Sequence, residues 1–381
     1  MNNKMAVLFI FLLGNIYAGW VAQISGTNAN LNDVYFPSDT LTGYICGDSG
    51  IILKTANSGN DWIRQTTPVT TNLNAIYFLG DSGWSVGNAG TVLMTTNGGD
   101  SWYDCLIPAG INFYDVYFVN VYDGLVIGEG GLIFRTTDGG SNWDYLIVIT
   151  DNTLRNMSFI NSYLGWLVGD NGFCAKTIDG GRSWQMLQIF TPNILRGVYF
   201  INQDTGYAVC DFGIIAKTTN GGQTWDVFSL LYNLYGIDFE DSVTGYICGQ
   251  AGYIIKIPSG QVTFVNISID LYSINFPVPR VGWTVGSNGS IYKTSDGMPV
   301  TEELNKRNVS SISCSPNPFT DYLIVKIPTQ TKTSLKIYDK AGNLVAEKKI
   351  SKGLFRLNSR ILSKGVYFIK INGIITKVIK I

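Results

Sequence analysis

Hydrophobic residues recur in one pattern about every 41 residues along most of this 381-residue chain. Each copy opens with Leu or Phe, has an apolar residue three positions later, and has Phe two positions after that. The copies begin at Leu31, Leu73, Phe113, Leu154, Leu195, Leu234 and Leu271. Seven copies at nearly constant spacing indicate a tandem array of one structural unit.

Each copy continues as short strands separated by glycine turns. A Gly-aromatic pair such as Gly83-Trp84 opens a second apolar strand, which ends at a G-x-x-G turn such as Gly169 to Gly172. A third strand ends in Lys-Thr or Arg-Thr, and a Trp after the next polar turn opens a fourth. Four strands per repeat are typical of a propeller blade, whereas a solenoid needs helical or single-strand units. The sequence therefore predicts an all-β, seven-bladed β-propeller.

The two ends of the array predict how the ring closes. Trp20 lies 11 residues before Leu31, the spacing that separates Trp62, Trp102 and Trp143 from the next copy. The seventh copy ends near Gly297 without a Trp or a fourth strand. Residues 20–24 are therefore predicted to supply the outer strand of blade seven, which removes two open sheet edges.

The Trp-bearing turn has a recurrent polar pattern, seen clearly in residues 136–143, Thr-Thr-Asp-Gly-Gly-Ser-Asn-Trp. A short Asp or Asn side chain accepts hydrogen bonds from the backbone N–H groups that follow it, and Trp packs back over the turn. The pattern resembles the Asp-box of sialidases, sortilin and several glycosidases. In those families the box is structural and lies away from the catalytic centre, so we expect a structural role here.

The complete repeat, L-x-x-h-x-F followed by G-[WY]-x-V-G-x-x-G and [KR]-T-T-[DN]-G-G-x-x-W, resembles the photosystem II stability and assembly factor family. The resemblance covers about residues 20 to 298, so we assign the propeller to residues 19–298. Members of that family are seven-bladed propellers that act as binding scaffolds and not as enzymes. The resemblance implies the fold without implying a role in photosynthesis.

Charge separates a second domain from the propeller. Residues 312–381 contain 13 Lys and Arg against 3 Asp and Glu, whereas the rest of the chain contains 14 against 25. Alternating strands are predicted there, and a turn at residues 339–343 joins two of them. The strands span residues 322–327, 334–338, 344–350, 365–371 and 374–379. Residues 312–381 are therefore predicted to form a small β-sandwich.

This domain resembles the type A sorting domain of the type IX secretion system of Bacteroidetes. The similar features are S-P-N-P at residues 315–318, L-K-I-Y-D-K-A-G-N-L-V at 335–345, and L-S-K-G-V-Y-F at 362–368. The resemblance implies recognition by the type IX machinery, export across the outer membrane, and removal of the domain with attachment to surface lipopolysaccharide. Residues 299–311 are predicted to be a linker where cleavage occurs. The alternative is an ordinary carbohydrate-binding sandwich.

The N-terminus predicts export across the inner membrane. Lys4 precedes the apolar run Met5–Leu13, and Ile16-Tyr17-Ala18 is a suitable cleavage site, so residues 1–18 are interpreted as a signal peptide. No later segment is apolar for long enough to predict a transmembrane helix. The expected location is therefore the cell surface or the surrounding medium.

The residue types present exclude several chemistries. The chain has no His, which removes the commonest general base and most zinc sites. The six Cys residues form no C-x-x-C pair, so no metal and no cofactor is expected. Most should be buried free thiols, and Cys210 with Cys248 is the pair to examine for a disulfide.

One position in each repeat is a candidate binding residue. If the first strand is innermost, the residue after the leading Leu or Phe surrounds one mouth of the channel. The candidate ligand-binding residues are Tyr114, Arg155, Arg196, Tyr235 and Tyr272, with Asn32 and Asn74 completing the ring. Arg and Tyr are enriched at binding hot spots, although the ring could equally only fill or solvate the channel. Replacing Arg155 and Arg196 together is expected to weaken ligand capture without altering stability.

Two classes of function remain. The favoured one is a secreted or cell-surface binding protein, without catalytic residues, for a protein or a glycan. The alternative is a glycan-active hydrolase of an Asp-box propeller type that uses a carboxylate pair. Asp33, Asp115 and Asp238 are available in principle, but such residues most often cap turns. Nucleic acid is not expected as a ligand, because the propeller is acidic and the basic domain resembles a sorting module.

Overall fold

The structure, a computed structural model, divides the chain into two compact units, residues 1–298 and 299–381. The signal peptide predicted at residues 1–18 and the linker predicted at 299–311 lie outside the described residues. In the first unit the structure describes residues 19–297 except 38, 106, 108–109, 147–149, 188–190, 231 and 267. In the second it describes residues 313–315, 322–327, 333–340, 343–350, 353–358, 362–371 and 374–380.

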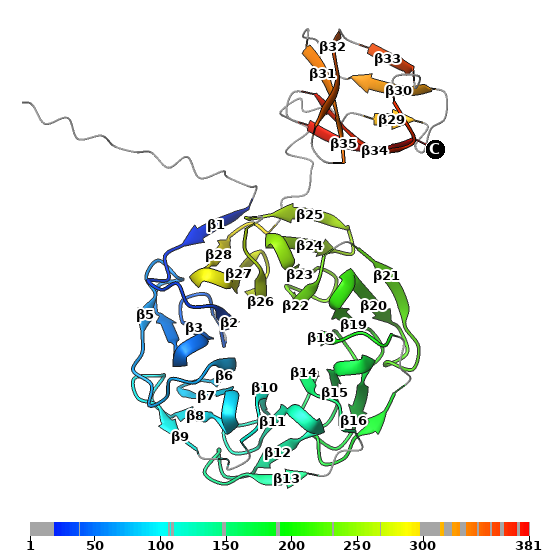
Figure 1. Cartoon of the computed structure of the whole chain (residues 1–381). Helices are drawn as coiled ribbons and strands as arrows, with labels where there is room; N and C mark the ends of the chain where they lie inside the picture. Colours follow the sequence, from blue (N-terminus) through cyan, green and yellow to red (C-terminus); the bar gives the residue numbers. More distant parts are fainter. Residues whose placement is uncertain are drawn as a thin grey trace, which may run out of the picture. The chain divides into compact units, whose positions relative to one another are not determined.

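The first unit is a ring of seven antiparallel four-stranded sheets, which confirms the predicted propeller (Figure 1). In every blade the first strand of the repeat is innermost. Blade one contains β2 (Leu31–Tyr35), β3 (Gly43–Gly47), β4 (Ile52–Thr55) and β5 (Ile63–Arg64). Blade two contains β6 (Leu73–Leu79), β7 (Ser82–Gly87), β8 (Val92–Thr95) and β9 (Tyr103–Asp104). Blade three contains β10 (Phe113–Phe118), β11 (Gly124–Gly128), β12 (Ile133–Thr136) and β13 (Asp144–Leu146).

The remaining blades repeat this order. Blade four contains β14 (Leu154–Phe159), β15 (Gly165–Gly169), β16 (Cys174–Thr177) and β17 (Gln185–Met186). Blade five contains β18 (Leu195–Phe200), β19 (Gly206–Cys210), β20 (Ile214–Thr218) and β21 (Asp226–Ser229). Blade six contains β22 (Leu234–Phe239), β23 (Gly245–Gly249), β24 (Tyr253–Ile257) and β25 (Gln261–Phe264). Blade seven contains β26 (Leu271–Val278), β27 (Val281–Gly286), β28 (Ile291–Thr294) and β1 (Trp20–Gln23).

A short 3-10 turn joins the second and third strands of each blade. These turns are η1 (Asp48–Gly50), η2 (Asn88–Gly90), η3 (Glu129–Gly131), η4 (Asp170–Gly172), η5 (Asp211–Gly213), η6 (Gln250–Gly252) and η7 (Ser287–Gly289). Their middle residues have left-handed backbone angles, with φ between 54° and 63°. The chain therefore reverses within three residues and returns along the blade.

Strand β1 closes the ring as the position of Trp20 predicts. It pairs antiparallel with β28, so that Trp20 lies opposite Thr294 and Gln23 opposite Ile291. The Trp20 indole is almost fully buried and packs edge-on against Phe276 with ring centroids 6.0 Å apart. Trp62 makes the same contact with Phe36 in blade one, at 6.1 Å. The N-terminal strand thus supplies both the missing strand and the missing Trp of blade seven.

The inner-strand Phe residues connect neighbouring blades. Phe78 stacks on Tyr44 of the preceding blade with ring centroids 3.5 Å apart, and Phe118 stacks on Trp84 at the same distance. The opposite face of the Phe78 ring lies on Gly83, where a Cβ would be only 2.3 Å from the ring. The glycine at this position of each repeat is therefore required by the close approach of the Phe ring and not by a turn.

A β-bulge occurs near the start of the inner strand in all seven blades. In blade one the pairing register shifts between Leu31 and Asp33, and the same shift recurs in the other six. A bulge places two successive residues on one face of a strand. Positions two and three of each repeat consequently both face the channel, whereas positions one, four and six pack in the core.

The second unit is a two-sheet sandwich, which confirms the predicted architecture. One sheet contains β29 (Ser313–Ser315), β30 (Tyr322–Ile327) and β33 (Gly353–Asn358); the other contains β32 (Leu344–Ile350), β31 (Thr333–Asp339), β34 (Gly365–Ile371) and β35 (Ile374–Lys380). The core between the sheets includes Leu323, Val325, Ile337 and Ile369. The short strand β29 and the strand β33 were absent from the sequence prediction.

Replacing Trp20 tests the closure of the ring. Trp20→Ala leaves a cavity against Phe276 and should lower the free energy of unfolding of the propeller by about 3 kcal/mol, as is typical for a buried Trp. Urea denaturation followed by intrinsic fluorescence measures this change. The neighbouring side chain of Val21 is 66% exposed, so Val21→Ala is the matched control and should change stability little. Equal effects of the two substitutions would contradict the closure.

Candidate binding site at the mouth of the central channel

The inner strands of all seven blades enclose a central cavity of about 460 Å3. All seven ring residues predicted from the sequence line this cavity, so the structure brings the candidate site together. These residues are Asn32, Asn74, Tyr114, Arg155, Arg196, Tyr235 and Tyr272. They lie in the bulge at the start of each inner strand, next to the residue that pairs with the end of the second strand, and therefore on the side of the ring that carries the 3-10 turns. We call this side the mouth face.

The two arginines of the ring are paired with aspartates of their own blades. Arg155 donates Nε and one terminal nitrogen to the two carboxylate oxygens of Asp170, at 2.7 and 3.0 Å. Arg196 pairs with Asp211 in the same way, at 2.7 and 3.1 Å. Asp170 and Asp211 are the first residues of η4 and η5. These pairs were not predicted, because the sequence of both turns indicates only a tight reversal of the chain.

Tyrosine rings pack against the same two guanidinium groups that the aspartates bind. The Arg155 guanidinium lies over the Tyr114 ring at 4.6 Å, and the Arg196 guanidinium lies over the Tyr235 ring at 5.4 Å. Tyr235 in turn contacts Tyr272, with ring centroids 5.8 Å apart. Planar guanidinium groups fixed by bidentate pairing and a ring face are pre-organised. The mouth thus presents an ordered surface and not a set of free charges.

The two asparagines of the ring bind the neighbouring blade. Asn32 Nδ2 donates to Asp48 at 3.1 Å and to the Leu73 carbonyl of the next inner strand at 2.8 Å. Asn74 Nδ2 donates to Asn88 and to the Phe113 carbonyl, at 2.9 and 2.7 Å. These side chains therefore connect blades one, two and three, and their structural role is stronger than a role in ligand binding.

Three carboxyl groups lie deeper in the channel wall, and the expectation that they cap turns was wrong. Asp33, Asp115 and Asp238 accept hydrogen bonds from backbone N–H groups of the next blade's inner strand. The donors are Ile76 for Asp33 at 2.9 Å, Met157 for Asp115 at 2.7 Å and Phe276 for Asp238 at 2.6 Å. An inner strand is a sheet edge with unpaired N–H groups, and a side chain from the preceding blade satisfies them.

Burial in the channel wall raises the pKa of these carboxyl groups. The pKa rises to about 6 for Asp33, about 7 for Asp238 and about 8 for Asp115, although the hydrogen bonds from N–H groups act in the opposite direction. The channel also contains Tyr35, Tyr77, Tyr117 and Tyr199. Burial raises the pKa of Tyr35 to about 12, so its phenol stays neutral in ordinary conditions.

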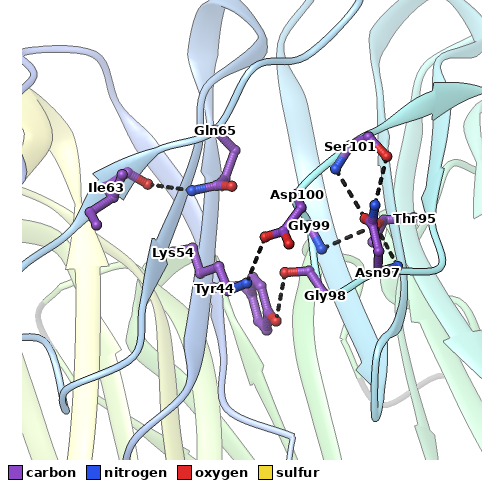
Figure 2. A network of polar contacts seen from close by, with 10 residues as sticks. All are labelled: Tyr44, Lys54, Ile63, Gln65, Thr95, Asn97, Gly98, Gly99, Asp100 and Ser101. Atoms are coloured by element: carbon purple, nitrogen blue, oxygen red, sulfur yellow. Dashed lines mark hydrogen bonds and ion pairs between the residues drawn. The ribbon is translucent and has the colours of Figure 1, made fainter.

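The Trp-bearing turns lie at the opposite end of each blade from the mouth face. In blade two the Asn97 side chain accepts the Ser101 N–H at 3.0 Å, and the Thr95 hydroxyl accepts the Gly99 N–H at 3.0 Å (Figure 2). The Gly98 carbonyl of this turn accepts a hydrogen bond from the Tyr44 hydroxyl of blade one at 3.0 Å. These contacts give the turn an inter-blade role, and the hydrogen bond to the threonine hydroxyl was not predicted from the sequence.

The described residues contain no disulfide, no metal cluster and no membrane-spanning helix. Cys46, Cys105, Cys174, Cys210 and Cys248 are free thiols, so Cys210 and Cys248 form no disulfide. Among the described residues no cluster of three or more Asp, Glu or Cys side chains is arranged to hold a metal ion. No helix in the described part of the chain is long and apolar enough to cross a membrane.

The raised pKa values predict how stability depends on pH. The folded propeller holds these carboxyl protons more tightly than the unfolded chain, so the free energy of unfolding should fall as pH rises from about 4 to about 8. The loss is at most about 1.4 kcal/mol per pH unit for each group. Urea denaturation at several pH values measures it. Asp115→Asn should reduce the dependence, whereas Asp151→Asn, at an exposed position, should not; a stability that rises through this window would contradict the prediction.

The arginine pairs change the expectation that the mouth arginines are dispensable for stability. Arg155→Ala leaves the Asp170 carboxylate partly buried without its partner and should lower the free energy of unfolding by about 1 kcal/mol. The double variant Arg155→Ala with Asp170→Ala should cost less than the sum of the single changes. Denaturation of the four proteins of this cycle gives the coupling energy, and a value of zero would contradict the pairing.

Two family models match the chain. Residues 15–108 and 141–232 match the photosynthesis system II assembly factor YCF48, and residues 313–381 match the secretion system C-terminal sorting domain. A sorting domain of this kind indicates export to the cell surface or beyond. No curated protein is significantly similar in sequence.

Solved structures share the propeller fold. A structure of YCF48 bound to D1 peptide is 22% identical, covers 73% of this chain and 97% of its own, and has a TM-score of 0.64. YCF48 from Cyanidioschyzon merolae is 18% identical over 73% of this chain and 98% of its own, with a TM-score of 0.62. The WD40 propeller domain of Doa1 is 11% identical over 73% and 97%, with a TM-score of 0.59. The chain thus combines a propeller of the YCF48-like type with a C-terminal sorting domain of secretion systems.

Proposed function

We propose that this chain is an exported, non-catalytic binding protein that takes a protein or a glycan at the mouth of its propeller channel. The observation that carries the proposal is the ordered ring at the mouth, where Arg155 and Arg196 are fixed between a carboxylate and an aromatic face. Ordered Arg and Tyr side chains around a concavity are typical of binding hot spots. Their order lowers the entropy cost of capturing a partner.

The similar propellers favour a binding role. One of them is described as YCF48 bound to D1 peptide, so a propeller of this type takes a polypeptide. This chain has the same type of repeat over residues 15–108 and 141–232. A polypeptide is therefore the first ligand class to examine, and a glycan is the second.

Export completes the proposal. In this proposal the signal peptide at residues 1–18 first directs the chain across the inner membrane. The type IX secretion machinery then recognises the sorting domain at residues 313–381. Cleavage in residues 299–311 would then leave the propeller at the cell surface or in the medium. The strong positive charge of residues 312–381 belongs to this sorting step and not to ligand binding.

The alternative, a glycan-active hydrolase, would have to use Asp33, Asp115 or Asp238. Their raised pKa values are suitable for acid–base chemistry. Each carboxyl group, however, accepts an N–H from its own strand as well as one from the next blade. Groups used in this way as connections between blades are poorly placed to exchange protons with a substrate, which favours binding without catalysis.

Paired peptide and glycan arrays test the proposal. The full chain and the variant Tyr235→Ala with Tyr272→Ala are labelled and applied to the same arrays. The wild-type chain should bind a defined subset of probes, and the variant should lose at least about tenfold in affinity for them because the mouth loses its aromatic surface. Tyr103→Ala, at a residue 56% exposed on the outer strand β9, is the control and should bind like the wild type.

A parallel hydrolysis screen separates the two functions. Bound glycans are incubated with the full chain, and newly formed reducing ends are measured. No release is expected, and turnover that disappears in Asp115→Asn would replace the binding proposal with the hydrolase. Binding that is identical for the wild type and the Tyr235 and Tyr272 variant would place the ligand elsewhere.

A further inference from the structure

Phe212 breaks the pattern of the 3-10 turns on the mouth face. It is the middle residue of η5, has φ 61°, and is 71% exposed. The equivalent residues of the other six turns are small or polar. They are Ser49, Ala89, Gly130, Asn171, Ala251 and Asn288.

Phe212 is unfavourable for the folded propeller on two counts. A left-handed backbone costs roughly 1 kcal/mol for a residue with a bulky side chain, and Asn or Gly adopts it more easily. The exposed ring also leaves apolar surface in water and forms no part of the buried core. Folding of blade five therefore does not explain this residue, whereas contact with a partner would.

The position of Phe212 connects it to the candidate ring. The preceding residue, Asp211, pairs with Arg196 of the ring. The Phe212 backbone N–H donates to the Asn233 side chain at 2.7 Å, and Asn233 lies two residues before Tyr235. Leu230, 37% exposed, adjoins the same turn through its N–H, which donates to the Gly213 carbonyl at 2.9 Å. Phe212 and Leu230 are therefore two exposed apolar residues at the mouth-face end of blade five.

The mouth face is acidic. Its charged residues lie in the 3-10 turns, in the segments leading into the inner strands, and in the ring itself. The acidic residues there are Asp48, Glu129, Asp151, Asp170, Asp211 and Asp270. Arg155 and Arg196 are the cations among the described residues of this set, and both are already paired. Five lysines lie instead at the other end of the blades, over aromatic rings: Lys54, Lys176, Lys217, Lys256 and Lys293.

We infer that the partner is a polypeptide segment that carries Lys or Arg side chains beside an apolar side chain, and that this apolar side chain packs on Phe212. The inference rests on the proposed binding function and names its ligand class. Charge complementarity selects the basic segment, because the paired arginines leave the mouth face net negative. The exposed aromatic ring supplies the apolar anchor.

Short fluorescent peptides test the inference on the full chain. The probes are a Lys–Leu repeat, a Lys–Ser repeat and a Glu–Leu repeat, and binding is measured by fluorescence anisotropy. The Lys–Leu peptide should bind most tightly, and its affinity should fall as salt concentration rises. Phe212→Asn should weaken its binding by about tenfold while the midpoint of urea denaturation stays the same or rises. Binding of the Glu–Leu peptide equal to or tighter than that of the Lys–Leu peptide would overturn the inference.

Ala251→Asn is the matched control, because Ala251 occupies the equivalent position in η6 with φ 57°. It should leave peptide affinity unchanged, since no exposed aromatic ring is removed. If Phe212→Asn also left the affinity unchanged, the apolar anchor would be disproved. If the arrays identify mouth ligands that are acidic peptides or glycans, this inference fails while the proposed binding function stands. If the mouth variant loses no array ligand, the proposed function itself fails.

Discussion

The stacking of aromatic rings between neighbouring blades is the contact on which the rest of the structure depends. Each inner-strand Phe, exemplified by Phe200, lies against an aromatic residue of the preceding blade, here Trp166 at 3.5 Å, and against a glycine of its own blade, here Gly206. A blade cannot bury its Phe alone, so the ring is stable only when every blade has a neighbour on both sides. This requirement explains why the N-terminal strand must return to blade seven.

The bulge of the inner strand gives the channel two kinds of position. The residue directly after the first Leu or Phe lies at the mouth, where Arg155 and Tyr235 line the cavity. The next residue, as in Asp33 and Asp115, lies deeper and holds the following blade by its backbone N–H groups. Position two thus carries the ring that is proposed to bind a ligand, and in blades one and two its Asn32 and Asn74 also bind the next blade.

The fold was predictable from the sequence because each repeat carries the same residues at the positions that form strands, turns and inter-blade contacts. Two features specified the closure: the distance of Trp20 from Leu31, which equals that of Trp62 from Leu73, and the absence of a Trp and a fourth strand in the seventh copy. The bulge also has a signal, because apolar residues at positions one, four and six break the alternation of a regular strand. That signal was missed, and with it the inward direction of Asp33 and Asp115.

The site was less predictable, because its contacts join residues that are distant in sequence. Asp115 binds the N–H of Met157, 42 residues later, and Arg155 binds Asp170 across a strand and a turn. Neither pairing has a local pattern. Phe212 is different, since a large aromatic residue in the middle of a G-x-x-G-type turn is visible by comparison with the other six turns. That Phe212 is unfavourable for the folded propeller became clear only from its left-handed backbone angle and from the exposed fraction of its side chain.

The mouth face therefore combines an ordered ring, an acidic surface and one exposed aromatic residue. The stacked aromatic residues and the buried aspartates of the scaffold hold the blades together. The most direct test is site-specific photo-crosslinking of the full chain in cells that export it. A benzophenone amino acid at the Tyr272 position should give a discrete crosslinked product, and one at the exposed Tyr103 position on the outer strand should not. Crosslinking at position 103 without crosslinking at position 272 would contradict a binding site at the mouth.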